Sequence, residues 1–446
     1  MSTAIVRPTL TSRAPDVTEP TPAADPGTRA GRRARGGGPA QTGRDSRVGR
    51  LVLALLVPLA AATVVGLVLL WPSEDPPAVE SGELVTATVT GIQACPDLPP
   101  DQCSLAEVLV TSGLDAGQTL LAGAPVGVGA PEVAVGDDVV LQANIDAPPD
   151  ERYVVVDFQR GPVLWVLAAL FAIAVVALAR WRGIAALVGL GVSLALLTGF
   201  VLPAVLAGSP PLLVATVGAA AIAIITMVLA HGPSLRTGVA LLGTLLSLTL
   251  TAVLGAVAIE LGELTGLADE SSAFLQAFGV EIDPRGLLLA GLVIGALGVL
   301  DDVTITQTAA VAEVHAADPS LPRRRLLASG LRVGRDHVAA TVNTLVLAYA
   351  GAALPLLLLF TLSTSGLSQV VTSELVATEV VRTLVGAIGI VAAVPVTTAL
   401  AAALLAGPSS EPGYPGRSPR SVRDSLGASS AYPTTPSSGD TTDRAQ

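Results

Sequence analysis

Two adjacent carboxylates, Asp301 and Asp302, interrupt an apolar run, GLVIGALGVLDDVTITQ, that is otherwise suited to lipid. An ionisable group inside a membrane span costs a few kcal/mol and by default marks a route for a substrate or an ion. Counting from Arg285 at about 1.5 Å per residue places the pair roughly 24 Å into a hydrocarbon core of ~30 Å. Alternatively, the two carboxylates reach the inner headgroups and only end the span.

Two later apolar runs bring polar groups to the same depth. One continues from GRDHVAAT into an Asn-Thr pair, and the other carries a Thr-Thr pair just after Pro395. Proline lacks a backbone N–H, so it frees a carbonyl that an ion could use, although Thr hydroxyls can also bond to their own helix. Together with the carboxylates, these groups predict a cation or proton site formed by Asp301, Asp302, Asn343, Thr344, Thr397 and Thr398.

Four further charged residues read as structural. Arg335 and Asp336 in the GRDH turn would lie at the membrane interface, where Arg335 could act as a counter-charge to the carboxylates. Glu379 and Arg382 are spaced i, i+3, a separation that brings helical side chains together, so they predict a salt bridge without a catalytic role.

The sequence offers no pattern typical of an enzyme. Both intramembrane carboxylates lie on one helix, whereas an aspartyl protease needs them on two, and there is no GxSxG, HExxH or P-loop motif. The three His residues are dispersed, so no metal site and no cofactor are predicted. A net charge of −11 with scattered Arg also argues against a nucleic-acid partner.

The composition is that of a chain surrounded by lipid. Only 14% of the residues are charged and the mean hydropathy is +0.66, whereas a soluble domain has about 25% charged residues. Eight apolar runs are long enough to cross a bilayer, which takes about 20 residues. They are residues 51–70, 163–179, 184–206, 212–230, 239–259, 287–304, 338–362 and 381–405.

The Arg distribution predicts the orientation of these spans. With the N-terminus inside, all basic residues fall in the tails and inner loops except Arg152, Arg160, Arg285 and Arg382, as the positive-inside rule requires. Both termini are then cytoplasmic in an inner-membrane protein. The predicted organisation is a disordered N-tail (1–50), a first helix (51–70), an outer domain (71–162), a seven-helix membrane domain (163–406) and a disordered C-tail (407–446).

The acidic outer region reads as five short strands separated by Gly and Asp turns. The segments are GELVTATVTGI, SLAEVLVTSG, GQTLLAG, VAVGDDVVLQANI and ERYVVVDFQR. Five such strands predict a small OB-like barrel. Cys95 and Cys103 lie within it, outside the cytoplasm, where a disulfide can persist; if the proline-containing loop between them cannot close, both remain free thiols.

The sixth to eighth runs also resemble a known family. The stretches GALGVLDDVTITQTAAVAEV, GRDHVAATVNTLVLAYAG and GAIGIVAAVPVTTALAA are similar to the YibE/F family of bacterial multi-pass membrane proteins, and VAVGDDV and VVVDFQR resemble its outer domain. The resemblance implies a multi-pass membrane topology but carries no established activity, although some members are loosely described as permeases. Where the family has one Asp in the sixth span this chain has two, and Asp302 aligns better.

Two functions follow as hypotheses. The polar groups of the last three runs predict a permease or channel-like protein for an ion or a small solute. The alternative is a non-transporting envelope protein whose outer domain binds a partner while its helices serve as an anchor. The expected partners are the lipid bilayer, an ion or small solute, and a second copy of the chain or an envelope protein.

Overall fold

The structure is a computed structural model that describes residues 42–73, 82–95, 99, 102–144, 147–148, 152–268, 274–275, 282–362 and 366–405. Most of the two tails predicted to be disordered lies outside these residues. The exception is 42–50, which forms the first turns of helix α1 (Thr42–Leu69). No proline lies between Pro39 and this span, so nothing in the sequence stops the helix from extending beyond its apolar part.

The five predicted strands form a closed barrel. They are β1 (Glu83–Ala94), β2 (Ser104–Val110), β3 (Thr119–Ala124), β4 (Asp138–Ala143) and β5 (Tyr153–Phe158). Their order is β1-β2-β3-β5-β4, and neighbouring strands pair antiparallel except β3 with β5, which are parallel. Alternate residues of β1, namely Val85, Ala87 and Val89, are buried, because successive strand side chains point to opposite faces. The predicted small barrel is therefore confirmed.

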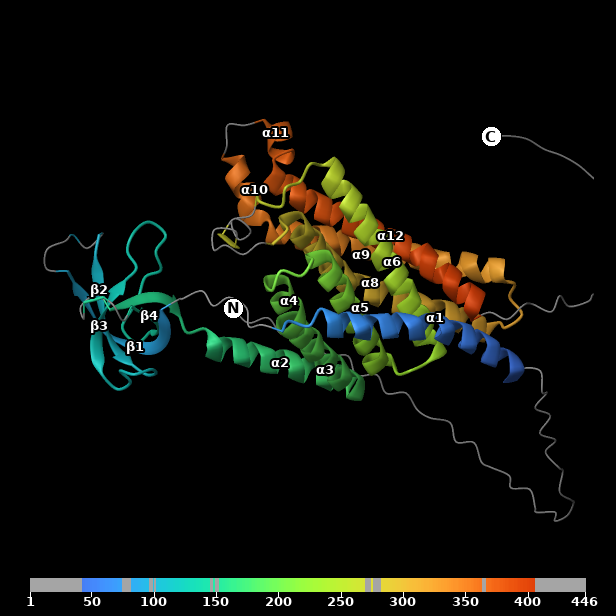
Figure 1. The fold of residues 1–446 in the computed structure, drawn as a ribbon, viewed down its shortest axis with the longest axis horizontal. Helices are drawn as coiled ribbons and strands as arrows, with labels where there is room; N and C mark the ends of the chain where they lie inside the picture. Colours follow the sequence, from blue (N-terminus) through green and yellow to red (C-terminus); the bar gives the residue numbers. More distant parts are fainter. Residues whose placement is uncertain are drawn as a thin grey trace, which may run out of the picture. The chain divides into compact units, whose positions relative to one another are not determined.

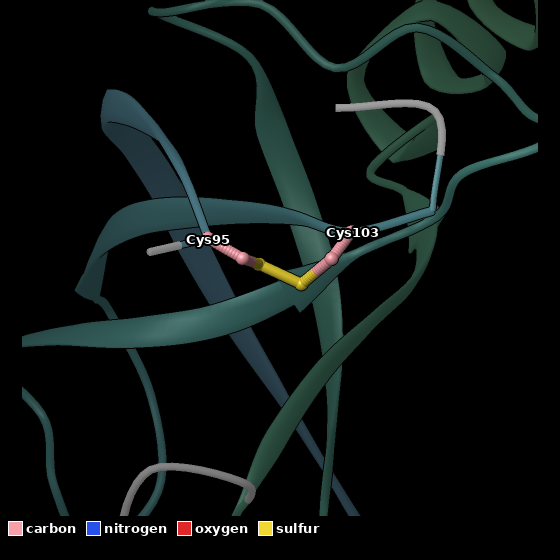
Figure 2. Close-up of a disulfide and its surroundings, with 2 residues drawn as sticks. All are labelled: Cys95 and Cys103. Atoms are coloured by element: carbon pink, nitrogen blue, oxygen red, sulfur yellow. A yellow bond between two sulfur atoms is a disulfide. The ribbon is translucent and has the colours of Figure 1, made fainter. Parts of the chain in front are cut away.

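A disulfide between Cys95 and Cys103 joins the end of β1 to the start of β2, as Figure 2 shows. We expect Cys103→Ser to lower the free energy of unfolding of the barrel by about 2–3 kcal/mol, because the open loop gains conformational freedom in the unfolded chain. Thermal unfolding of the full-length protein, with and without reductant, measures this loss. Reductant should have no effect on the barrel of the Cys95→Ser/Cys103→Ser variant. Maleimide labelling of both thiols in the unreduced wild type would contradict the prediction.

Tyr153 at the start of β5 ties that strand to the loop after β2. Its hydroxyl donates a hydrogen bond to Asp115 Oδ2, and this bond, together with burial, raises the pKa of Tyr153 from 10.0 to about 12. Because the folded state favours the neutral phenol, its stabilising contribution is complete below pH 10 and is lost as the pH rises towards 12. The absorbance titration of the wild type minus that of Tyr153→Phe should show a midpoint at the raised pKa of Tyr153, about 12. Asp115→Asn should move this midpoint down towards 10.0. An unchanged midpoint in Asp115→Asn would refute this assignment.

The rest of the described chain is mainly helical (Figure 1). They are α2 (Gly161–Ala179), α3 (Trp181–Leu196), the π-helical turn Leu197–Val201, α4 (Leu202–Leu206), α5 (Pro211–His231), α6 (Leu235–Leu261), α8 (Pro284–Ala317), α9 (Arg323–Ala352), α10 (Leu354–Thr361), α11 (Leu367–Val371) and α12 (Glu374–Leu404). Within the described residues, seven helical segments are long and apolar enough to cross a membrane. These are Val48–Leu69, Gly161–Ala179, Trp181–Leu206, Pro211–His231, Leu235–Leu261, Pro284–Ala317 and Glu374–Leu404.

The count of eight unbroken spans is wrong at one position. The run 338–362 is divided between α9 and the short helix α10, which meet at Ala353. Pro355 explains the break, because it has no N–H to bond to the carbonyl of Gly351 and its ring clashes with that carbonyl in a continuous helix. In the first turn of a new helix a proline is tolerated, so α10 begins there.

Four helices, α6, α8, α9 and α12, form the tightly packed part of the bundle, where they lie side by side in Figure 1. Glycines allow this close approach. A Cβ atom on Gly389 of α12 would lie 2.2 Å from Thr251 Oγ1 on α6, and one on Gly334 of α9 would lie 2.3 Å from Val394 on α12. Small residues serve this purpose in membrane helices, because lipid provides no hydrophobic drive for helix association.

Candidate functional site

Asp301 and Asp302 line a cavity of about 310 Å³ between α3, α5 and α8. Glycine and alanine leave the space on the α3 side, since Ala185, Ala186 and Gly189 have little or no side chain. The full lining is Ala185, Ala186, Gly189, Leu190, Thr226, Met227, Ala230, His231, Gly298, Asp301, Asp302 and Ile305. The carboxylates are thus directed into a space between helices, and α9 and α12 contribute no residue to it.

The two carboxylates have different surroundings. Asp301 is half-buried: its Oδ2 lies 3.3 Å from the hydroxyl of Thr226, which also donates to the carbonyl of Ile222 at 2.7 Å. Its Oδ1 is buried and makes no hydrogen bond of normal geometry in the described structure, although the hydroxyl of Thr244 lies near the carboxylate. Asp302 is exposed. A buried carboxylate oxygen without a partner is costly, so Asp301 is the residue at which a proton or a cation would be stabilised most.

His231 is brought to the same cavity from the last turn of α5. The prediction treated it as one of three dispersed histidines, because its distance from Asp301 in the sequence hides their proximity in space. An imidazole ring can both donate and accept a hydrogen bond, so the cavity combines such a group with the carboxylates. Among the described residues, no group of three His, Cys, Asp or Glu side chains is arranged to hold a metal ion.

A second set of polar groups, which we call the polar seam, lies between α6, α8, α9 and α12. Its members are Thr244, Ser247, Thr251, Thr304, Gln307, Thr308, Thr397 and Thr398, and all of them are buried. The predicted pair Thr397 and Thr398 belongs to this seam, while the other six were missed. A signal was present on α6, where Thr244, Ser247 and Thr251 are spaced i, i+3, i+7 and therefore share one face.

The seam begins next to Asp301. The hydroxyl of Thr304 lies 3.2 Å from the backbone carbonyl of Asp301 and 2.6 Å from the hydroxyl of Thr244 on α6. This contact links α8 to α6 one turn after the carboxylates. A run of hydroxyls inside an apolar bundle provides groups that can both donate and accept hydrogen bonds.

Gln307 forms the other part of the seam and fixes α9 and α12 to α8. Its Nε2 donates to the carbonyl of Gly330 and to the hydroxyl of Thr398, both at 2.7 Å. Three nearby hydroxyl oxygens, those of Ser247, Thr308 and Thr397, are buried without a partner in the described structure. The seam is therefore only partly satisfied by the protein itself.

Asn343 and Thr344 do not join the carboxylates. Both are exposed on α9, and the hydroxyl of Thr344 donates to the carbonyl of Ala340 in its own helix. The physical reason is helical phase: at 3.6 residues per turn, Gln307 lies roughly 240° around α8 from Asp301. The face of α8 that meets α9 is thus not the face that carries Asp301.

The predicted structural residues have separate positions. Pro395 is exposed on α12, as is Val391, whose carbonyl it leaves without a helical donor, whereas Thr397 and Thr398 are buried. Arg335 and Asp336 are exposed as well, and the described structure contains no ion pair for either of them. Glu379 and Arg382 form a salt bridge at 2.7 Å.

The comparisons with known proteins bear on the helical region. A family model described as YibE/F-like protein matches residues 167–407, which is more than half of the chain. The match confirms the resemblance seen in the last three apolar runs. It begins after the barrel, so the two strand segments that resembled the family's outer domain lie outside it. No curated protein and no solved structure matches the chain.

Proposed function

The chain belongs to the YibE/F-like family, and from this premise we propose that it is a permease or channel-like protein that moves a proton or a small cation along the Asp301 cavity and the polar seam. The proposal includes no catalytic step, no cofactor and no nucleic-acid partner. It replaces the predicted six-residue site, which included Asn343, by a site centred on Asp301, with Asp302, Thr226 and His231 around it.

The observation that carries the proposal is the buried Oδ1 of Asp301, which has no partner in the described structure and lies at a cavity within a helix suited to span a membrane. A carboxylate in such a place costs free energy and by default marks a functional site. The alternative, that the pair only ends the span, is disfavoured by the burial of Asp301 Oδ1 at a cavity between helices, because a carboxylate that merely reached the headgroups would be solvated.

The experiment is reconstitution of the full-length protein into liposomes. Under an imposed membrane potential, an enclosed pH-sensitive dye should report proton entry above that of empty liposomes, and parallel assays with Na⁺, K⁺ and Mg²⁺ test the cations. Absence of flux for all four ions would reject the proposal.

We further infer that the barrel is OB-like and lies outside the cytoplasm of a bacterial inner membrane, with both termini inside. The Arg distribution supports this orientation, and the disulfide fits an oxidising compartment. A reporter that is active only outside the cytoplasm should work when fused after Ala130 in the barrel region and fail after Ser320 between α8 and α9. Activity after Ser320 would invert the proposed topology.

A second candidate function is binding of an envelope partner by the barrel, without transport. It is favoured by apolar side chains on the outside of neighbouring strands. Leu84 of β1 and Val154 of β5 are both paired with Gln142 of β4 and are 61% and 45% exposed. If this candidate is correct, Leu84→Asp/Val154→Asp should reproduce the phenotype of a deletion strain, while Asp301→Asn should have none. A homo-oligomer is compatible with either function.

A further inference from the structure

Two cavities adjoin each other where α9, α10 and α12 meet, far along α8 from Asp301. Their volumes are about 520 and 270 Å³, and they share the lining residues Tyr349, Ala353, Leu356 and Glu379. Ligand cavities typically measure about 300–1,000 Å³. The break between α9 and α10 lies at this space, since Ala353 lines both cavities.

The smaller cavity is an apolar groove on a surface suited to lipid. Its lining includes Val346, Leu357, Val380 and Leu384, which are 40%, 39%, 38% and 54% exposed. Exposed aliphatic side chains on helices of a membrane protein contact acyl chains. The groove therefore suits a hydrocarbon chain entering from the bilayer.

The adjoining end of the larger cavity is polar. Glu379 and Arg382, which form a salt bridge at 2.7 Å, both line it, and their side chains are 30% and 31% exposed. Only Glu379 Oε1 and Arg382 Nη1 take part in that bridge. In the described structure the second carboxylate oxygen and the other guanidinium nitrogens have no hydrogen-bond partner. The site thus presents one negative and one positive group side by side, and each can form further hydrogen bonds.

We propose that this groove binds one bilayer phospholipid whose headgroup carries both a phosphate and a primary ammonium, as in phosphatidylethanolamine. The phosphate would bind the free guanidinium nitrogens of Arg382, whose planar fork suits phosphate. The ammonium would bind the free carboxylate oxygen of Glu379, and an acyl chain would occupy the apolar groove. A purely anionic headgroup matches Arg382 but is repelled by Glu379, so charge complementarity selects the zwitterion.

Native mass spectrometry of the full-length protein tests this binding. The protein is first delipidated in detergent and then mixed with equal amounts of phosphatidylethanolamine and phosphatidylglycerol. We expect phosphatidylethanolamine adducts to dominate in the wild type. In Arg382→Gln, adducts of both lipids should fall by about tenfold, as expected for the loss of one charge-assisted hydrogen bond.

Two further variants keep the proposal testable if Arg382→Gln folds poorly. Glu379→Gln should reverse the preference towards phosphatidylglycerol, since it removes the repulsion and leaves Arg382. Thr383→Trp should fill the groove and reduce both adducts, whereas the control Val253→Trp, on an exposed face of α6, should leave them unchanged. Equal binding of the two lipids by the wild type, or unchanged adducts in Thr383→Trp, would overturn the proposal. So would cross-linking between copies through Leu384→Cys in native membranes.

Discussion

Asp301→Asn is expected to abolish ion flux in reconstituted liposomes while the protein remains folded. The fall should be on the order of a hundredfold or more, which is the effect of removing a positioned proton carrier. Asparagine has nearly the same shape but can neither bind a proton near neutral pH nor neutralise a cation. Removing a buried charge without a strong partner generally costs little stability and can increase it, so the melting temperature should not fall.

Asp302→Asn is the matched control, because the two carboxylates are adjacent and line the same cavity but only Asp301 is half-buried with an oxygen lacking a partner. We expect Asp302→Asn to retain most of the flux. If both variants accumulate poorly or melt early, the carboxylates are structural. If Asp302→Asn is inactive and Asp301→Asn is active, the site has been assigned to the wrong residue.

Gly389→Ala is expected to destabilise the helical bundle. The added methyl group would lie 2.2 Å from the hydroxyl of Thr251. Thr251 is fully buried and bonded to the carbonyl of Ser247, so it cannot easily move aside. Overpacking of this kind typically destabilises by about 1–3 kcal/mol. The melting temperature of the detergent-solubilised protein measures it.

Gly386→Ala provides a control on the same helix, one turn earlier. There the new methyl group would meet Leu345 at 3.7 Å, an ordinary contact, so stability should be unchanged or slightly higher because alanine favours helix. The double variant Gly389→Ala/Thr251→Ala should recover much of the loss, because it removes the hydroxyl that clashes. A Gly389→Ala protein that melts with the wild type would contradict the close packing of α6 and α12.

The barrel was the part of the fold best predicted from sequence. Burial alternates along β1, β2, β4 and β5, as in β1, where Val85, Ala87 and Val89 point inward. Strand periodicity depends only on neighbouring residues, so it can be recognised without knowing what a strand pairs with. Pro355, by contrast, lies inside a run so apolar that hydropathy alone concealed the helix break it causes.

The sequence predicted how far along its helix each site residue lies, but not the direction in which its side chain points. Hydropathy and helical rise predicted a common depth for Asp301, Asn343 and Thr397, but a predicted depth does not say which neighbour a side chain faces. Three different environments resulted: a cavity for Asp301, an exposed helix face for Asn343, and the buried seam for Thr397. Gln307 was not predicted as part of a site, because a single amide has no characteristic spacing in the sequence, although its hydrogen bonds join three helices.

Closure of the barrel has a consequence for the order in which the chain folds. β1 pairs with β2 directly, but also with β4, and the ring is complete only when β5 joins β3 and β4. Each helix, in contrast, forms through bonds to residues four positions away. Non-local pairing slows folding, so the ring should be the slowest element to form. The helix α2 starts at Gly161, soon after Phe158 ends β5, and should already be helical when the ring closes. The hairpin of β1 and β2 can assemble before the ring closes, and Cys95 and Cys103 are then already close enough to be oxidised.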